Sequence, residues 1–135
     1  MGDRVSVQFR CTDNEGVRSS VVLFSHWGGK AFARRAYRYA LELRGETDGA
    51  LMPLDRFDPE TVMVDFIREV TREQDRVRCD LYLGASVANG DNTDNGHYIV
   101  WLLRGRVLVF HQYGDEEPYE VDPEDAQLKG IEVAA

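Results

Sequence analysis

The sequence predicts an α+β protein with two layers, a mostly antiparallel sheet and two helices on one face, in the order ββααβββ. Three observations lead to this fold class. Apolar residues alternate with polar ones along several short segments, which is typical of half-buried strands. Two longer segments repeat apolar residues at helical spacing. The strand segments follow one another closely on either side of the helices, so hairpins should dominate the sheet.

The N-terminal segment is predicted to be a β-hairpin. From Arg4 to Cys11, apolar and polar side chains alternate without a break, as expected for a strand with one buried face. Residues 13–16 are rich in turn formers. A second run of strand formers covers residues 18–25, so the hairpin should span residues 4–25.

The two helices are predicted from the spacing of their apolar residues. Residues 31–44 place an apolar stripe on one side of a helix, and Gly45 is the expected stop. The second helix should begin at Asp58 and Pro59, because aspartate is a preferred N-cap and proline is favoured at the first helical position. Arg68 suits the negative end of this helix.

The rest of the chain is predicted to return to the sheet. The apolar run before the 104–105 turn should form a central strand that is buried on both faces. The predicted segments are a strand at 77–83, a polar loop at 84–96, strands at 97–103 and 106–112, and a short element at 123–128.

Length and composition indicate one soluble domain. The chain has 135 residues, 43% of them hydrophobic and 30% charged, which is ordinary for a globular protein. It has no apolar run of membrane-spanning length and no secretory signal pattern at its start. We therefore expect a cytoplasmic protein without a membrane partner. Residues 1–113 should form the α+β domain, and 114–135 an acidic segment that is part of this domain or a tail.

Charge is concentrated in the C-terminal segment. Of the formal net charge of −8, residues 114–135 hold eight acidic side chains against one lysine, so the rest is nearly balanced. Non-specific nucleic-acid binding is not expected, because it requires a basic surface. The segment is interpreted as a solvated end, and the alternatives are a surface for a basic partner or a mimic of nucleic acid. Cys11 and Cys79 fall on apolar strand faces, which favours buried thiols over a disulfide or a zinc site.

A candidate binding site lies where the second strand meets the first helix. Several backbone N–H groups at a helix start point outward near the positive end of its dipole, and anions bind there. Lys30 and Arg34 add positive charge where acidic side chains are usually favoured. The alternative is a tight corner in which two glycines supply unusual backbone angles and Trp27 fills the core. The candidate ligand-binding residues are Ser25, His26, Trp27, Gly28, Gly29, Lys30 and Arg34.

The polar loop before the central strand is a second candidate site. No cofactor is expected, and the one alternative is a divalent metal ion bound by acidic and histidine side chains of the loop, with Asp91, Asp94 and His97 as ligands. A calcium-binding EF-hand is excluded, because Leu102 occupies the position of the bidentate glutamate and no helices flank the loop. The alternatives are a solvated loop of turn formers or a polar binding loop.

The corner sequence also resembles a known family. Residues 23–29, Leu-Phe-Ser-His-Trp-Gly-Gly, are similar to a motif in an uncharacterised family of small bacterial, archaeal and phage-borne proteins. The similarity extends weakly over residues 5–103. No activity is established for this family, so the resemblance implies none, but it suggests that residues 25–29 lie beside the 84–97 loop. A phage or mobile-element setting would make a host protein a natural partner.

These observations favour a binding protein without catalytic activity. It would bind an unknown protein partner or a small anionic ligand through Ser25–Lys30 and the 84–97 loop. The alternative is a phosphate- or nucleotide-handling hydrolase, and a third possibility is the nucleic-acid mimic. A hydrolase requires its catalytic groups to converge within hydrogen-bond reach, whereas a binding protein requires an exposed apolar anchor. The candidate catalytic residues are His26, Asp91, Asp94 and His97.

Overall fold

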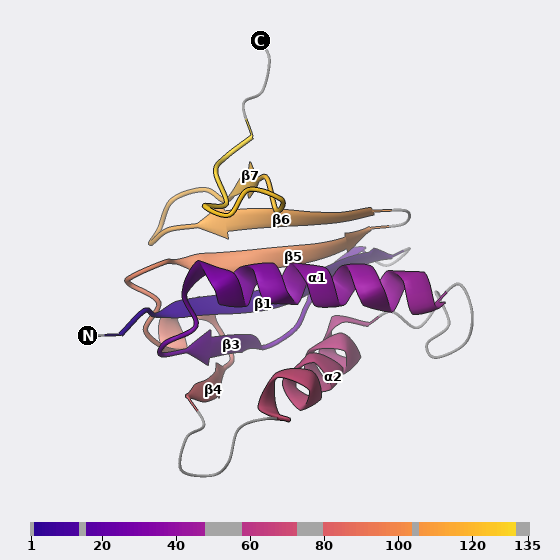
Figure 1. The fold of residues 1–135 in the computed structure, drawn as a ribbon, viewed down its shortest axis with the longest axis horizontal. Helices are drawn as coiled ribbons and strands as arrows, with labels where there is room; N and C mark the ends of the chain where they lie inside the picture. Colours follow the sequence, from indigo (N-terminus) through magenta and orange to yellow (C-terminus); the bar gives the residue numbers. More distant parts are fainter. Residues whose placement is uncertain (1, 14–15, 48–57, 73–79, 104–105, 132–135) are drawn as a thin grey trace.

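The computed structural model describes residues 2–13, 16–47, 58–72, 80–103 and 106–131, and it confirms the predicted α+β class. Two helices pack on a seven-stranded, open sheet (Figure 1). The strands are β1 (Val5–Asp13), β2 (Gly16–Ser19), β3 (Val22–Ser25), β4 (Leu81–Gly84), β5 (His97–Leu103), β6 (Arg106–Gln112) and β7 (Tyr119–Val121). The helices are α1 (Gly29–Thr47) and α2 (Pro59–Thr71), and a short 3₁₀ turn covers Val87–Asn89.

The sheet has the strand order β4-β3-β1-β5-β6-β7, with β2 paired to β1 next to β3. All neighbours are antiparallel except β1 and β5, which run parallel with Val7 opposite Tyr98. A parallel pair needs a crossover connection, and here the chain between the two strands includes both helices. The parallel pair lies at the centre of the sheet, so β5 is the central strand that its apolar sequence predicts.

Both helices pack on one face of the sheet, as predicted. Helix α1 contacts β1, β5 and β6, and α2 contacts β1 and β2. Phe9 of β1 lies at the centre of this layer, with its ring centroid 6.0 Å from that of Tyr39 in α1 and 5.4 Å from that of Phe66 in α2. On the other face of β5, His97 and Ile99 are buried, whereas Trp101 is only half-buried.

The predicted N-terminal hairpin is present, but its second strand is divided. Residues Ser20 and Val21 separate β2 from β3. The Ser20 hydroxyl donates to the Val21 carbonyl at 2.7 Å and accepts from the Phe9 N–H at 3.1 Å. Serine competes with a strand ladder in this way because its side chain bonds nearby backbone groups.

The two helices differ in how well their ends were predicted. Helix α1 begins at Gly29 and runs through Gly45, so the predicted stop at Gly45 is wrong. A single glycine costs a helix about 1 kcal/mol relative to alanine, which the packing of the earlier turns can offset. The start of α2 is as predicted, because Asp58 Oδ1 accepts from the Thr61 N–H at 2.7 Å and Pro59 is the first helical residue.

The acidic C-terminal segment contributes to the core. The predicted element at 123–128 is wrong, since those residues form turns and the strand is β7, which pairs with β6. Val121 and Leu128 are buried, and Glu124 accepts a hydrogen bond from the Tyr37 hydroxyl. No described helix is both long and apolar enough to cross a membrane. Cys11 is buried in the core, while the turn at 104–105, Cys79 and residues 77–79 of the third predicted strand lie outside the described residues.

Candidate functional site

The corner between β3 and α1 is held by the carboxylate of Asp80. Ser25 lies at the end of β3 and its hydroxyl donates to Asp80 Oδ2 at 2.9 Å. The Trp27 N–H donates to the same oxygen at 3.3 Å, and the Gly28 N–H donates to the Ser25 hydroxyl at 2.9 Å. These backbone N–H groups of the corner therefore donate to acceptors within the chain itself.

A second carboxylate, that of Asp3, lies against the start of α1. The Gly29 N–H donates to the Asp3 carbonyl at 2.9 Å, and the Asp3 N–H donates to the His26 carbonyl at 2.8 Å. A Cβ atom on Gly29 would lie 2.3 Å from Asp3 Oδ2, and Gly29 has a φ of +60°, so glycine is required. The first turn of α1 has no acidic residue. Asp3 and Asp80 supply the negative charge that favours a helix N-terminus.

The two ring side chains of the corner, those of His26 and Trp27, are exposed. Trp27 is 61% exposed, so the interpretation that it fills the core is wrong. His26 is also exposed, and its ring centroid lies 4.9 Å from that of Tyr82 in β4. Tyr82 in turn stacks on Phe24 with ring centroids 4.9 Å apart. His26 and Trp27 thus expose an imidazole and an indole to solvent, on a backbone that hydrogen bonds to Asp80 and Asp3 hold in place.

The 84–97 loop lies beside the corner, as the family resemblance implies. The Tyr82 hydroxyl accepts from the Asp91 N–H at 2.9 Å. The Asn95 side chain donates to Asp3 Oδ1 at 2.6 Å, and a Cβ atom on Gly90 would lie 2.6 Å from the Phe24 ring. Loop and corner are therefore joined through the N-terminal segment and through the Phe24 and Tyr82 rings.

The two aspartates of the loop face Arg4. Arg4 Nε lies 3.4 Å from Asp91 Oδ2, and the Arg4 N–H donates to Asp94 Oδ2 at 2.9 Å. Thr93 donates to Asp91 Oδ1 from its hydroxyl at 2.7 Å and from its N–H at 3.1 Å. These bonds from Thr93, and then the charge of Arg4, lower the pKa of Asp91. Both carboxylates thus contact Arg4, the residue that precedes β1.

His97 is buried in a hydrogen-bond network of the sheet. Its Nδ1 lies 2.8 Å from the Ser6 hydroxyl, and its Nε2 lies 3.1 Å from Gln8 Oε1. Ser6 also accepts from the Asn92 amide at 2.8 Å. A neutral imidazole satisfies this set, with Nδ1 accepting from Ser6 and Nε2 donating to Gln8. Burial lowers the pKa of His97 to about 4.

The three candidate metal ligands, Asp91, Asp94 and His97, do not form a cluster. Asp91 and Asp94 are oriented toward Arg4, and both ring nitrogens of His97 are bonded to Ser6 and Gln8. Within the part of the chain that the structure describes, no three His, Cys, Asp or Glu side chains are placed to share a metal ion. The two carboxylates share Arg4 as their partner, whereas the imidazole bonds two residues of β1.

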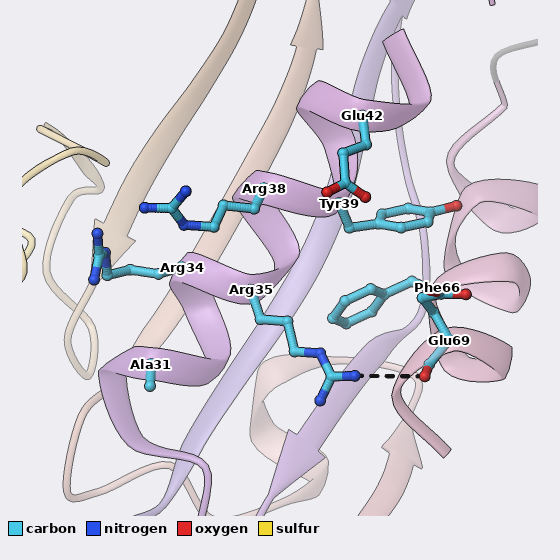
Figure 2. Close-up of a pocket in the computed structure, with 8 residues that line it drawn as sticks. All are labelled: Ala31, Arg34, Arg35, Arg38, Tyr39, Glu42, Phe66 and Glu69. Carbon is cyan, nitrogen blue, oxygen red and sulfur yellow. Dashed lines mark hydrogen bonds between the residues drawn. The ribbon is translucent and has the colours of Figure 1, made fainter. Parts of the chain in front are cut away.

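Arg34 is separated from the corner. Helix α1 begins at Gly29, so Arg34 lies in the second turn, about 7.5 Å along the axis. It lines a groove of about 340 Å³ on the outer surface of α1, next to α2 (Figure 2). Of the seven predicted ligand-binding residues, the structure brings Ser25, His26, Trp27, Gly28, Gly29 and Lys30 to the start of the helix.

Sequence reasoning missed several residues that build this region. Asp3 and Asp80 are far from the corner in sequence, and only the pairing of β1, β3 and β4 brings them to it. Arg4 and Tyr82 read as ordinary strand residues. Asn95 was included only as part of the polar loop, and its amide bonds both Asp3 and the Arg4 carbonyl. No local pattern in the sequence marks these contacts.

Comparison with known proteins finds no matching family model, no matching curated protein and no matching solved structure. The resemblance of the 23–29 motif therefore stays a prediction, and the function has to be argued from the geometry.

Proposed function

We propose that this chain is a cytoplasmic binding protein without catalytic activity, and that it recognises a protein partner through the corner and the adjoining loop. One observation carries the proposal: Trp27 is 61% exposed on a backbone that Asp80 and Asp3 hold in place. Tryptophan is enriched among the residues that dominate binding energy at protein interfaces. A pre-ordered backbone also reduces the entropy that binding costs.

The surroundings of Trp27 support a protein partner over a small anion at the corner. The N–H groups of Trp27, Gly28 and Gly29 donate to acceptors of the chain itself. An anion at this point would also lie close to the carboxylates of Asp3 and Asp80, and like charges repel. A partner that covers the indole and the His26 ring needs none of these donors.

The hydrolase alternative has less support. General acid–base chemistry needs groups within hydrogen-bond reach of the same reacting atom. His97 is buried and bonded to Ser6 and Gln8, and Arg4 lies beside both loop carboxylates. A phage or mobile-element origin, which the 23–29 motif suggests, is compatible with a host protein as the partner.

The test is a quantitative affinity capture from a lysate of the source organism with wild type, Trp27→Ala and Val64→Ala. Val64 on α2 is also 61% exposed, so it is a matched control for loss of exposed apolar surface. The proposal expects a protein that wild type and Val64→Ala retain and that Trp27→Ala retains at least tenfold less, since interface tryptophans contribute about 2 kcal/mol or more.

Recombinant partner should then show the same difference in dissociation constant. Trp27→Ala should leave the unfolding free energy within about 0.5 kcal/mol, because the side chain is exposed. Equal capture by wild type and Trp27→Ala, or no protein specific to wild type, would contradict the proposal.

A further inference from the structure

Two tyrosines on either side of the turn between β6 and β7 are exposed, although their hydroxyl groups are bonded to the chain. Tyr113 is 46% exposed and Tyr119 is 44% exposed. The Tyr113 hydroxyl donates to the Thr93 carbonyl. His111 Nε2 donates to the Asn95 carbonyl at 2.8 Å, so in the neutral imidazole Nδ1 is free to accept from the Tyr119 hydroxyl at 2.7 Å. The polar ends of both side chains are thus held, and their ring surfaces remain for contact.

The two rings also pack against His111 and against the backbone. His111 in β6 is the register partner of Tyr119 in β7. Its ring centroid lies 5.3 Å from that of Tyr119 and 6.1 Å from that of Tyr113. A Cβ atom on Gly96 would lie 3.1 Å from the Tyr113 ring, and one on Gly130 would lie 3.3 Å from the Tyr119 ring. Each tyrosine is therefore supported on part of its ring and open to solvent on the remainder.

Three acidic side chains lie in the turn between the tyrosines. Asp115, Glu116 and Glu117 are all exposed, and the Glu116 N–H donates to the Tyr113 carbonyl at 3.2 Å. The ion pairs between described residues involve other carboxylates, in the polar loop and on α2. The turn therefore places negative charge beside the aromatic surface, with no ion-pair partner among the described residues.

The charge at this end of the sheet is negative in balance. Figure 1 shows the turn between β6 and β7 at the same end of the sheet as the start of α1, where Lys30 is located. Burial lowers the pKa of His111, and the charges of Lys30 and Glu116 act on it in opposite directions. One ammonium group against the three carboxylates of the turn leaves a surplus of negative charge, which favours a partner of positive charge.

The chemistry of this surface identifies a basic protein segment as the partner. An aromatic ring attracts a cation placed over its face, and the planar guanidinium group of arginine also stacks on the ring. Tyrosine is enriched among the residues that dominate binding at interfaces, and it has few rotatable bonds to restrict. Carboxylates beside the rings can accept charge-assisted hydrogen bonds from the guanidinium N–H groups. The rings carry the contact, and the acidic turn selects the charge of the partner.

We propose that the surface formed by Tyr113, Tyr119 and the turn at 115–117 binds an arginine-bearing segment of a partner protein, with guanidinium groups over the tyrosine rings. This inference does not rest on the proposed function at the corner, because the two surfaces share no residue. It takes up one of the alternatives that the charge of residues 114–135 leaves open, a surface for a basic partner.

The test is a titration followed by isothermal calorimetry and by ¹H–¹⁵N NMR shifts, at constant ionic strength, with end-blocked peptides as probes. One peptide has three arginines separated by glycines, and a matched peptide has glutamine in place of arginine. We expect saturable binding of the arginine peptide alone, in the millimolar range or tighter, with the largest shifts at residues 111–120. Tyr113→Ala and Tyr119→Ala should each weaken binding about two- to fivefold, because a cation–π contact at an exposed site contributes about that factor.

Four further variants separate the explanations. Tyr119→Phe keeps the ring and should bind within about twofold of wild type. Glu116→Gln removes a carboxylate of the turn and should weaken binding. Glu60→Gln removes another exposed carboxylate, at the start of α2, and should leave binding unchanged, as should Trp27→Ala at the corner. The amide spectrum of each variant shows whether it is folded.

Four outcomes would each overturn the proposal. The first is the absence of saturable binding of the arginine peptide to wild type, and the second is equal binding of the glutamine peptide. The third is an equal loss in Glu60→Gln and Glu116→Gln, which would indicate attraction by net charge alone. The fourth is binding by folded Tyr113→Ala and Tyr119→Ala that matches wild type, or largest shifts at residues 25–30.

Discussion

The corner at Ser25–Lys30 leads into α1 and the groove lies on the outer surface of the same helix, but the two regions differ in what their hydrogen-bond donors contact. At the corner, backbone N–H groups donate to Asp80, Ser25 and Asp3. In the groove, the guanidinium groups have no carboxylate partner among the described residues. The donors near a helix start can therefore find their acceptors within the chain, as Asp3 and Asp80 show at the corner.

The comparison makes a general point about polar residues in this fold. At the corner, the polar groups hydrogen-bond to one another, so removing one of them should destabilise the protein. Between described residues the arginines of the groove form no ion pair, so removing one of them should leave stability nearly unchanged. Of three predictions, ordered from the largest expected effect to the smallest, the first concerns the buried polar network of His97 and the other two test this difference.

The largest effect should be the pH dependence that His97 causes. In the unfolded chain its pKa is near 6.5, and in the folded protein burial lowers it to about 4. Between these values the unfolded state binds the proton and the folded state does not. The free energy of unfolding is therefore highest above pH 6.5 as far as His97 is concerned. It should fall by about 3 kcal/mol as the pH is lowered from 6.5 toward 4.

Urea unfolding at a series of pH values measures this slope. His97→Gln should lose most of the dependence in that window, whereas His26→Gln, which removes an exposed histidine, should keep it. A wild-type slope that His97→Gln leaves intact would show that another group causes it. His111, whose pKa burial also lowers, is the group to examine in that case.

The next effect should come from a close approach at the corner. Gly29 and Gly114 have nearly the same backbone angle, with φ of +60° and +61°, but a Cβ atom would meet Asp3 at Gly29 and nothing within 4 Å at Gly114. These φ values lie in the left-handed region, where an alanine costs about 1 kcal/mol in backbone strain at either position. Gly29→Ala should cost about 1 to 2 kcal/mol more than Gly114→Ala, because the Asp3 carboxylate has to leave the helix start.

Chemical denaturation of the two variants provides the comparison, and the double variant Gly29→Ala with Asp3→Ala provides the control. Removal of the Asp3 side chain should reduce the further cost of a methyl group at Gly29. Equal losses for Gly29→Ala and Gly114→Ala would mean that the contact with Asp3 contributes nothing to the corner.

The smallest effect should be a contrast between Ser25 and the groove. Ser25→Ala removes a buried hydroxyl that donates to Asp80 and accepts from Gly28, and it should cost about 1 to 2 kcal/mol. Arg35→Gln removes an exposed charge that has no ion-pair partner among the described residues, and it should change stability by less than about 0.5 kcal/mol. Thermal unfolding of both variants measures the difference, and a larger loss for Arg35→Gln would reverse the roles of the two regions.

Local patterns predicted most of the fold. The alternation from Arg4 to Cys11 predicted β1, and helical spacing predicted α1 and α2, because side-chain periodicity reports which face of an element is buried. The Asp58 cap was predictable because its partner, Thr61, lies three residues away. Predictions failed where the signal was short or weak, as at β7, which has three residues.

The candidate site was predictable only in part. The sequence indicated the corner and the polar loop, since glycines and turn formers mark where a chain bends. It did not indicate that Trp27 is exposed, because an indole after a strand is equally compatible with a core. It also grouped Arg34 with the corner, although the helical rise carries Arg34 into the groove.

The sequence by itself determined the class of the fold, the two helices, the hairpin and the concentration of acidic residues at the C-terminal end. These properties depend on composition or on residues a few positions apart. The tertiary structure alone decided which donors have acceptors: Asp3 and Asp80 reach the corner through strand pairing, and Arg4 lies between the loop carboxylates, whereas the groove arginines have no carboxylate partner among the described residues. The physical reason is that a hydrogen bond or an ion pair requires atoms to meet within about 3 to 4 Å, and only the folded chain brings residues so distant in sequence to that distance.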